Sequence, residues 1–112
     1  MPVVTCGCGA AGEAPAERRA VGVDPELKQR NVKRLRRIEG QVRGLQRMVE
    51  EERYCADIMT QIASVQEALR SVGRELMRNH LKHCAASAIR AGDEQAEAMY
   101  DELIDLMYRH VR

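Results

Sequence analysis

The sequence predicts an all-α protein, and two observations support this fold class. Apolar residues recur at steps of three and four along most of the chain, the period of an amphipathic helix, and no segment shows the alternation of a half-buried strand. The chain has 112 residues, which is enough for one compact domain. We therefore expect a three-helix protomer with two long helices and a short C-terminal helix.

The first predicted helix spans about residues 25–51. The run Asp24-Pro25-Glu26 marks its start, because Asp is a favourable N-cap, Pro fits the first helical position and Glu complements the helix dipole. The apolar row that follows is Leu35, Ile38, Val42, Leu45 and Val49. The acidic run at 50–52 is unfavourable at the negative end of a helix dipole, so we expect the helix to end there.

The second predicted helix begins near Tyr54-Cys55 and is unusually long. Its apolar row is Ile58, Ile62, Val65, Leu69, Val72 and Leu76, and the row continues through His80 and His83 towards Gly92, a natural C-cap. A helix of about 36 residues is roughly 54 Å long, whereas a globule of this size is only about 26 Å across. The helix must project beyond a monomeric core, which predicts self-association. Asp93 can cap the third helix, whose row is Ala96, Met99, Leu103, Leu106 and His110.

The N-terminal residues differ in composition from the rest. Residues 1–23 are rich in Gly, Ala and Pro, so we predict a flexible tail over 1–23 and a helical domain over 24–112. No apolar run approaches the roughly 18 residues that span a membrane, and the first residues lack the features of a secretory signal. We therefore expect a cytoplasmic protein without a membrane partner, whose four Cys residues are thiols or metal ligands. We find no arrangement typical of an enzyme, and expect none.

The net charge of +1 conceals two segments of opposite charge. Residues 27–47 hold eight Lys and Arg against one Glu, a net charge of +7, and residues 91–112 hold six acids against two Arg, a net charge of −4. Acids four residues from these cations are nearly absent, which favours double-stranded DNA as a partner over a solvated face of ion pairs. Gly40 and Gly44 lie on the same outward face, where another molecule could approach closely. The candidate DNA contacts in this helix include Lys33, Arg34, Arg36, Arg37, Arg43 and Arg47.

Three residues of the second helix are candidate metal ligands. His80 and Cys84 are spaced i, i+4 and share a helix face, whereas Cys55 lies roughly 37 Å away along a straight helix. One chain cannot close this site, but an antiparallel dimer can bring Cys55 of one protomer to His80 and Cys84 of the other, giving two sites per dimer. Two thiolates and one imidazole suit three-coordinate Cu(I). The alternative is that the thiols are small buried hydrophobes and the His a core residue.

The blocks RLRRIEGQVRGLQRMVEEERYCADIMTQIASVQEAL and NHLKHC resemble the copper-sensing operon repressor (CsoR) family of metal-sensitive transcriptional repressors. The resemblance covers about residues 27–108. It implies an all-helical, disc-shaped tetramer built as a dimer of antiparallel dimers. It also implies an apo form that binds operator DNA and is released when the ligand binds, which here would derepress copper resistance genes.

The resemblance also assigns residues. Cys55, His80 and Cys84 match the positions of the copper ligands, and Tyr54 and Glu102 resemble the outer-shell residues beside them. A carboxylate on the free His nitrogen would fix the tautomer and orientation of the ring. Arg34 matches a basic residue implicated in operator contact, and Arg74 lies in a second basic patch. One familiar arginine position of the family is Ser71 here, with Arg70 adjacent.

Two features leave the ligand and the function partly open. Nickel-responsive relatives use additional His ligands, and this chain has only three His residues, which favours Cu(I) over Ni(II). Cys6 and Cys8 form a Cys-x-Cys pair without a counterpart in the family, which could hold a soft metal ion, accept copper from a chaperone, or have no metal role. The alternative functions are a Ni(II)-responsive repressor of the same family and a cytoplasmic copper buffer.

Overall fold

The computed structural model describes residues 17–110, and helices account for nearly all of that range. In chain order the helices are α1 (Pro25–Glu50), α2 (Cys55–Asn79), the π-helical turn η1 (His80–Ala85), α3 (Ala86–Arg90) and α4 (Asp93–His110). No strand occurs between residues 17 and 110, so the predicted all-α class is confirmed. None of the helices described is long and apolar enough to cross a membrane.

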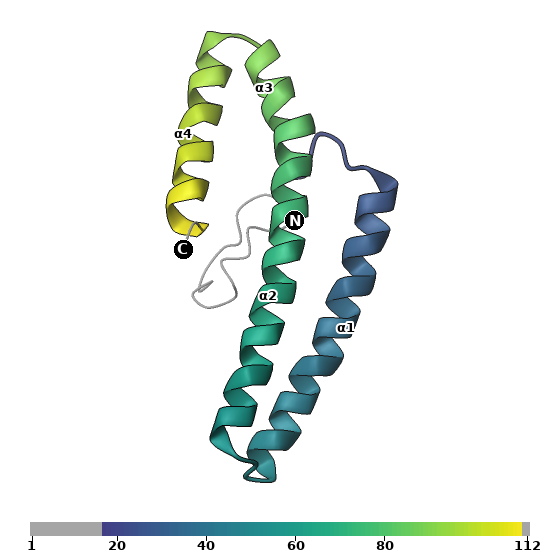
Figure 1. The fold of residues 1–112 in the computed structure, drawn as a ribbon. Helices are drawn as coiled ribbons and strands as arrows, with labels where there is room; N and C mark the ends of the chain where they lie inside the picture. The colour runs from purple at the N-terminus through teal and green to yellow at the C-terminus, as the bar shows by residue number, and fades with distance from the viewer. Residues whose placement is uncertain (1–16, 111–112) are drawn as a thin grey trace.

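Helices α1 and α2 form a long antiparallel hairpin with a small core (Figure 1). The core consists of Ile38 from α1 and Val65 and Val72 from α2, with Leu45 and Ala68 packed against them. Four of these five residues, all except Ala68, belong to the predicted apolar rows, and they fill only part of those rows. The hairpin therefore leaves apolar surface that the described part of the chain does not cover.

That unpartnered surface lies on both long helices. Five members of the predicted apolar rows are 39–54% exposed: Leu35, Val42, Ile62, Leu69 and Leu76. The protomer measures 56 × 34 × 25 Å and its radius of gyration is 17.5 Å, against about 13 Å for a compact chain of about 100 residues. The long hairpin thus extends beyond its own core, as the sequence predicts, and its apolar rows are available to a second copy.

The predicted second helix is continuous from Cys55 to Arg90, but it is not α-helical throughout. Residues His80–Ala85 form a π-helical turn. The π geometry is rare and is frequently found at functional sites. The turn is contacted from two sides, by Asp24 in the segment before α1 and by Glu102 of α4.

Two tight turns connect the helices. Helix α1 ends at Glu50, and Glu52 adopts a left-handed conformation with φ of 54°. Gly92 separates α3 from α4 and has φ of 134°. A residue with a side chain would adopt this φ only with strain. The second turn folds α4 back alongside α3 and η1 (Figure 1).

Residues 17–24, which we call the N-terminal arm, lie against α2 and η1. The Asn79 side chain, which is buried at the end of α2, donates to the Gly22 carbonyl at 2.9 Å. Its Oδ1 accepts the Asp24 N–H at 3.3 Å. Part of the predicted tail is therefore packed onto the helical domain; residues 1–16, including Cys6 and Cys8, lie outside the described residues. The division at residue 23 stays a prediction.

Candidate metal centre

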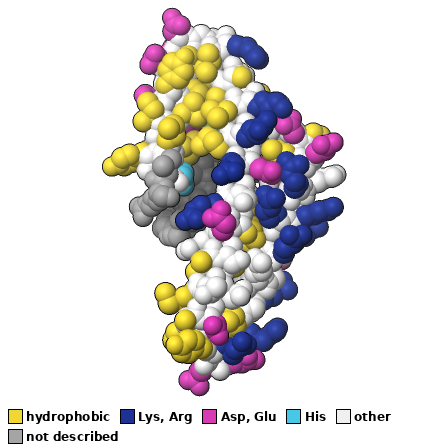
Figure 2. Space-filling model, viewed as in Figure 1, with side chains coloured by type: hydrophobic (Ala, Val, Ile, Leu, Met, Phe, Trp, Pro, Cys, Tyr) yellow, Lys and Arg dark blue, Asp and Glu magenta, His cyan; other side chains and the backbone are white. Residues whose placement is uncertain are grey.

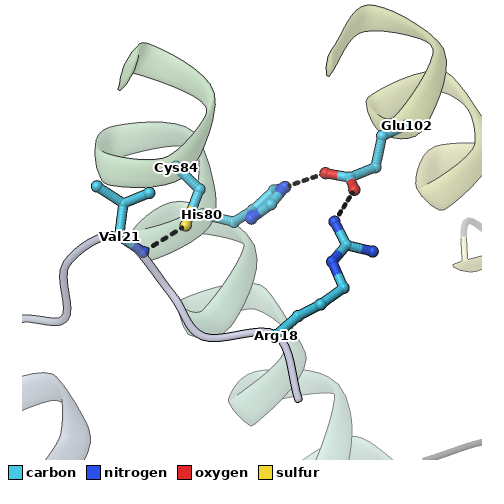
Figure 3. A network of polar contacts seen from close by, with 5 residues as sticks. All are labelled: Arg18, Val21, His80, Cys84 and Glu102. Carbon is cyan, nitrogen blue, oxygen red and sulfur yellow. Dashed lines mark hydrogen bonds and ion pairs between the residues drawn. The ribbon is translucent and has the colours of Figure 1, made fainter. Parts of the chain in front are cut away.

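His80, on the π turn, is held by a carboxylate from α4. Its Nε2 lies 2.8 Å from Glu102 Oε2, and both side chains are only partly exposed (Figure 3). A carboxylate can only accept a hydrogen bond, so the His80 Nε2 donates. In the neutral ring, Nδ1 then keeps its lone pair and is the nitrogen that can bind a metal ion. This is the contact expected for Glu102 from the sequence.

Cys84 lies on the same turn as His80. Its Sγ accepts a hydrogen bond from the Val21 N–H at 3.4 Å, and its side chain is partly exposed (Figure 3). The thiol is free. The turn therefore presents an imidazole and a thiol side by side, the donor types that soft metal ions prefer.

Glu102 has a second partner in the N-terminal arm. The Arg18 guanidinium lies 3.2 Å from Glu102 Oε1, while Oε2 faces His80 (Figure 3). Each carboxylate oxygen thus has its own partner. The sequence did not predict this ion pair, because residues 17–23 show no periodicity that would place them against α4.

His83, three residues from His80, belongs to a separate contact. Its Nε2 lies 3.0 Å from Asp24 Oδ1, and Lys82 Nζ lies 3.6 Å from the other oxygen. The hydrogen bond from His83 is the largest effect and holds the pKa of Asp24 below its usual value of 3.8. Burial opposes this shift, and Lys82 makes a smaller contribution in the same direction as His83. His83 therefore anchors the start of α1, and His80 is the imidazole that faces Glu102.

Cys55 and Tyr54 lie at the opposite end of α2 from His80 and Cys84. Tyr54 is the N-cap of α2, and both residues are exposed. Within residues 17–110, no group of three or more His, Cys, Asp or Glu side chains is close enough to hold a metal ion. The protomer brings together His80, Cys84 and Glu102 but leaves Cys55 apart. A complete three-ligand site requires a second chain, and that arrangement stays a prediction.

Most of the predicted basic residues are exposed along α1, and we call this set the basic face. Figure 2 shows Lys and Arg side chains gathered on the side of the molecule where α1 runs. Its exposed members are Lys33, Arg36, Arg37, Arg43 and Arg47, with Arg34 partly buried and Arg74 exposed on α2. A shallow hollow of about 390 Å³ at the start of α1 is lined partly by Lys28, Lys33 and Arg36. Within the face, Arg43 pairs with Glu39 at 3.6 Å.

One acid that neutralises part of the basic face comes from the neighbouring helix. Glu75 of α2 lies 3.0 Å from the Arg30 Nε and 3.9 Å from a terminal guanidinium nitrogen of Arg34. Arg30 is thereby turned towards α2, although a helical wheel places it on the outward face. The sequence signal along α1 could not reveal this pairing, because it depends on how the two helices are aligned.

The two glycines of the basic face lie in open surroundings. A Cβ atom added to Gly40 or Gly44 would meet nothing within 4 Å. Packing inside the protomer therefore does not require glycine at either position. Close approach by another molecule remains the physical reason that we favour for both.

Residues 27–109 match the protein family described as metal-sensitive transcriptional repressor. The chain belongs to this family. The resemblance noted in the sequence is thereby confirmed, and so is the expected class of metal-responsive transcriptional repressor. Family membership also implies that the chain binds operator DNA and self-associates.

Individual members of the metal-sensitive repressor family are closely similar to the chain. The copper-sensing transcriptional repressor CsoR of Bacillus subtilis is 48% identical over 79 residues, which cover 70% of this chain and 76% of the relative. The copper-sensing transcriptional repressor RicR of Mycobacterium tuberculosis is 47% identical over 87 residues, covering 78% of this chain and 91% of the relative.

Solved structures agree with this family membership. The copper-sensing repressor CsoR with Cu(I) from Geobacillus thermodenitrificans superposes with a TM-score of 0.72 at 44% identity, covering 82% of this chain and 94% of that one. A variant of the formaldehyde-responsive regulator FrmR from Salmonella enterica gives a TM-score of 0.64 at 31% identity, covering 80% of this chain and all of the other.

Proposed function

We propose that this protein is a Cu(I)-responsive transcriptional repressor, which binds operator DNA in the apo form and releases it when copper binds. The observation that carries the proposal is the paired imidazole and thiol of His80 and Cys84 on one turn, with Glu102 fixing the imidazole. The copper-sensing function of relatives at 48% and 47% identity supports the same ligand.

The proposed metal site joins two protomers. Cys55 of one chain and His80 and Cys84 of the other would hold Cu(I), and the bound ion would tie the two chains together. Two thiolates and one imidazole satisfy a three-coordinate Cu(I) ion, whereas Zn(II) would usually require a fourth ligand. Glu102 orients His80, and Tyr54 lies beside Cys55 at the same helix end.

The proposed operator interface is the basic face of α1 together with Arg74 of α2. Cations spaced along a helix contact phosphates and position the protein on the duplex. In a dimer of antiparallel dimers, the separation and angle of these faces depend on how the protomers pack. We propose that copper changes that packing, so that the basic faces of the tetramer no longer match the DNA.

Cys6 and Cys8 are proposed as an accessory soft-metal pair. A Cys-x-Cys pair offers two thiolates for Cu(I), and it could accept the ion from a copper chaperone. Such transfer would occur in the cytoplasm, where we expect the protein to act and where thiols stay reduced.

A DNA-binding assay with three metal states tests the proposal. Duplexes that bind the apo protein are first selected from a random library, and their affinity is then measured by fluorescence anisotropy under anaerobic conditions. We expect apo protein to bind and Cu(I) to weaken binding by about 5–150-fold, the usual range of allosteric coupling. Ni(II) should have little effect.

Two other outcomes would replace the proposal. Release of DNA by Ni(II) but not by Cu(I) would show that the protein is a nickel sensor. The visible d–d absorption bands of Ni(II) would identify the bound ion. Absence of any sequence-selected duplex, together with Cu(I) binding, would favour a copper buffer.

A further inference from the structure

Met59 lies one helical turn after Cys55 on α2, near the turn that joins α1 to α2 (Figure 1). The spacing is i, i+4, the same as that of His80 and Cys84, so the two side chains share a helix face. Cys55 is exposed, and Met59 is 68% exposed. This end of α2 therefore presents a thiol and a thioether together.

Packing among the described residues does not account for Met59. It falls outside the predicted apolar row of α2, whose nearest members are Ile58 and Ile62, and it is not part of the hairpin core. Ile62 is 39% exposed, well below the value for Met59. The thioether is therefore available to a second chain or to a ligand.

The proposed two-chain metal site places Met59 close to the ligands of the other chain. In a pair of antiparallel helices, a step of one turn along one helix is matched by one turn in the opposite direction along the other. If Cys55 of one α2 opposes residues 80–84 of the other, Met59 opposes residues 76–80. Met59 is thus placed within one helical turn of the imidazole that completes the site.

We propose that Met59 contributes its thioether sulfur to the Cu(I) site as a fourth, neutral ligand beside Cys55, His80 and Cys84. Methionine has three rotatable side-chain bonds, so its sulfur can reach an ion that is held one helical turn away. Thioethers are among the soft donors that select Cu(I), so Met59 raises the preference of the site for Cu(I) over Ni(II). The inference rests on the proposed function and deepens it, because it adds a ligand and a source of metal selectivity to the same site.

Selenium labelling tests the metal–thioether bond directly in full-length protein. Protein in which selenomethionine replaces all six methionines is loaded anaerobically with one Cu(I) per protomer, and X-ray absorption is recorded at the copper edge. We expect a copper–selenium contribution, because selenium replaces the thioether sulfurs and leaves the thiols unchanged. Met59→Leu should abolish this contribution, whereas Met77→Leu, which alters another methionine of α2, should keep it.

Metal affinities distinguish a ligand from a residue that only packs the two chains together. Leucine is close to methionine in volume, so Met59→Leu removes the sulfur and retains the apolar contact. The Cu(I) affinity, measured by competition with a chelator, should fall about 10-fold or more, since loss of even an outer-shell partner costs about 10–100-fold. The Ni(II) affinity should stay at the wild-type value, because Ni(II) gains little from a thioether.

The outcomes separate this inference from the proposed function. Absence of the copper–selenium contribution in wild type, its persistence in Met59→Leu, or equal changes in Cu(I) and Ni(II) affinity would overturn the role of Met59 as a ligand. If wild type binds Cu(I) without releasing DNA, it is the proposed function that fails, whatever the selenium signal. Wild-type protein that binds no Cu(I) would overturn both.

Discussion

Two single side chains affect measurable properties of this protein. One is buried and affects folding stability, and the other affects the charge of the basic face. Asn31 is 4% exposed, and neither its Nδ2 nor its Oδ1 has a hydrogen-bond partner within residues 17–110. Glu75 has the opposite situation, because it has two cationic partners on another helix. Each residue leads to a prediction that a substitution can check.

Replacing Asn31 with Leu should stabilise the protein. The substitution removes an unpaired buried amide, which costs about 1–3 kcal/mol, and adds apolar surface of similar volume between α1 and α2. We expect the free energy of unfolding to rise by about 1–2 kcal/mol in urea titrations at a fixed protein concentration. A decrease would mean that the amide has a hydrogen-bond partner in solution.

Replacing Glu75 with Gln should strengthen DNA binding. Arg30 and Arg34 lose their neutralising partner and become available to phosphates, so the slope of log affinity against log salt should steepen by about one unit. Glu67→Gln removes the same charge from α2 but frees Arg70, which lies outside the basic face. Equal effects of the two variants would show that Glu75 acts only through net charge.

At the scale of elements, the α1–α2 hairpin and the glycines of α1 serve different purposes. The hairpin core fixes how the two helices lie, whereas Gly40 and Gly44 contribute nothing to packing within the protomer. Glycine in a helix interior costs about 0.5–1 kcal/mol relative to alanine. A glycine that destabilises the helix where an alanine would fit indicates a role in contact with another molecule.

Gly44→Ala should therefore change folding stability and DNA affinity in opposite directions. The free energy of unfolding should rise by about 0.5–1 kcal/mol, because alanine favours the helix and meets no neighbour. Affinity for a selected duplex should fall, because the added methyl group obstructs close approach of the phosphate backbone. Unchanged affinity, measured by anisotropy at the same salt concentration, would remove DNA contact as the reason for this glycine.

Much of this element structure could be predicted from the sequence. The period of the apolar residues predicts the helix boundaries to within a few residues, and the long helix ends just before Gly92, as expected. The π turn could not be predicted, because six residues are too few for the apolar pattern to distinguish two helical periods. The Arg34–Glu75 pair and the arm contacts depend on the alignment of segments far apart in the chain, which local patterns do not encode.

At the scale of the whole molecule, the protomer is incomplete in two respects. Its apolar rows are partly exposed on both long helices, and His80 and Cys84 lie at the opposite end of α2 from Cys55. An antiparallel dimer would cover the rows and complete the metal site in one step. Family membership supports self-association, and the two-chain metal site is the most specific part of our proposal.

Mixed dimers should reveal that the site is shared. Neither Cys55→Ala nor Cys84→Ala protein can form an intact site by itself. When equal amounts are unfolded and refolded together, half of the dimers should contain both variants and hold one intact site, so Cu(I) binding should recover to about a quarter of the wild-type stoichiometry. No recovery, in a competition assay with a Cu(I) chelator, would place all three ligands in one chain.

The central claim is that Cu(I) binding across two protomers releases DNA, and an anaerobic Cu(I) titration of the protein–DNA complex tests it most directly. Wild-type protein and Cys55→Ala are compared by fluorescence anisotropy on the same duplex. We predict that wild type releases the DNA as copper approaches one ion per protomer, whereas Cys55→Ala binds DNA with wild-type affinity and retains it throughout. Release of DNA by Cys55→Ala at the same copper concentration as wild type would contradict the account.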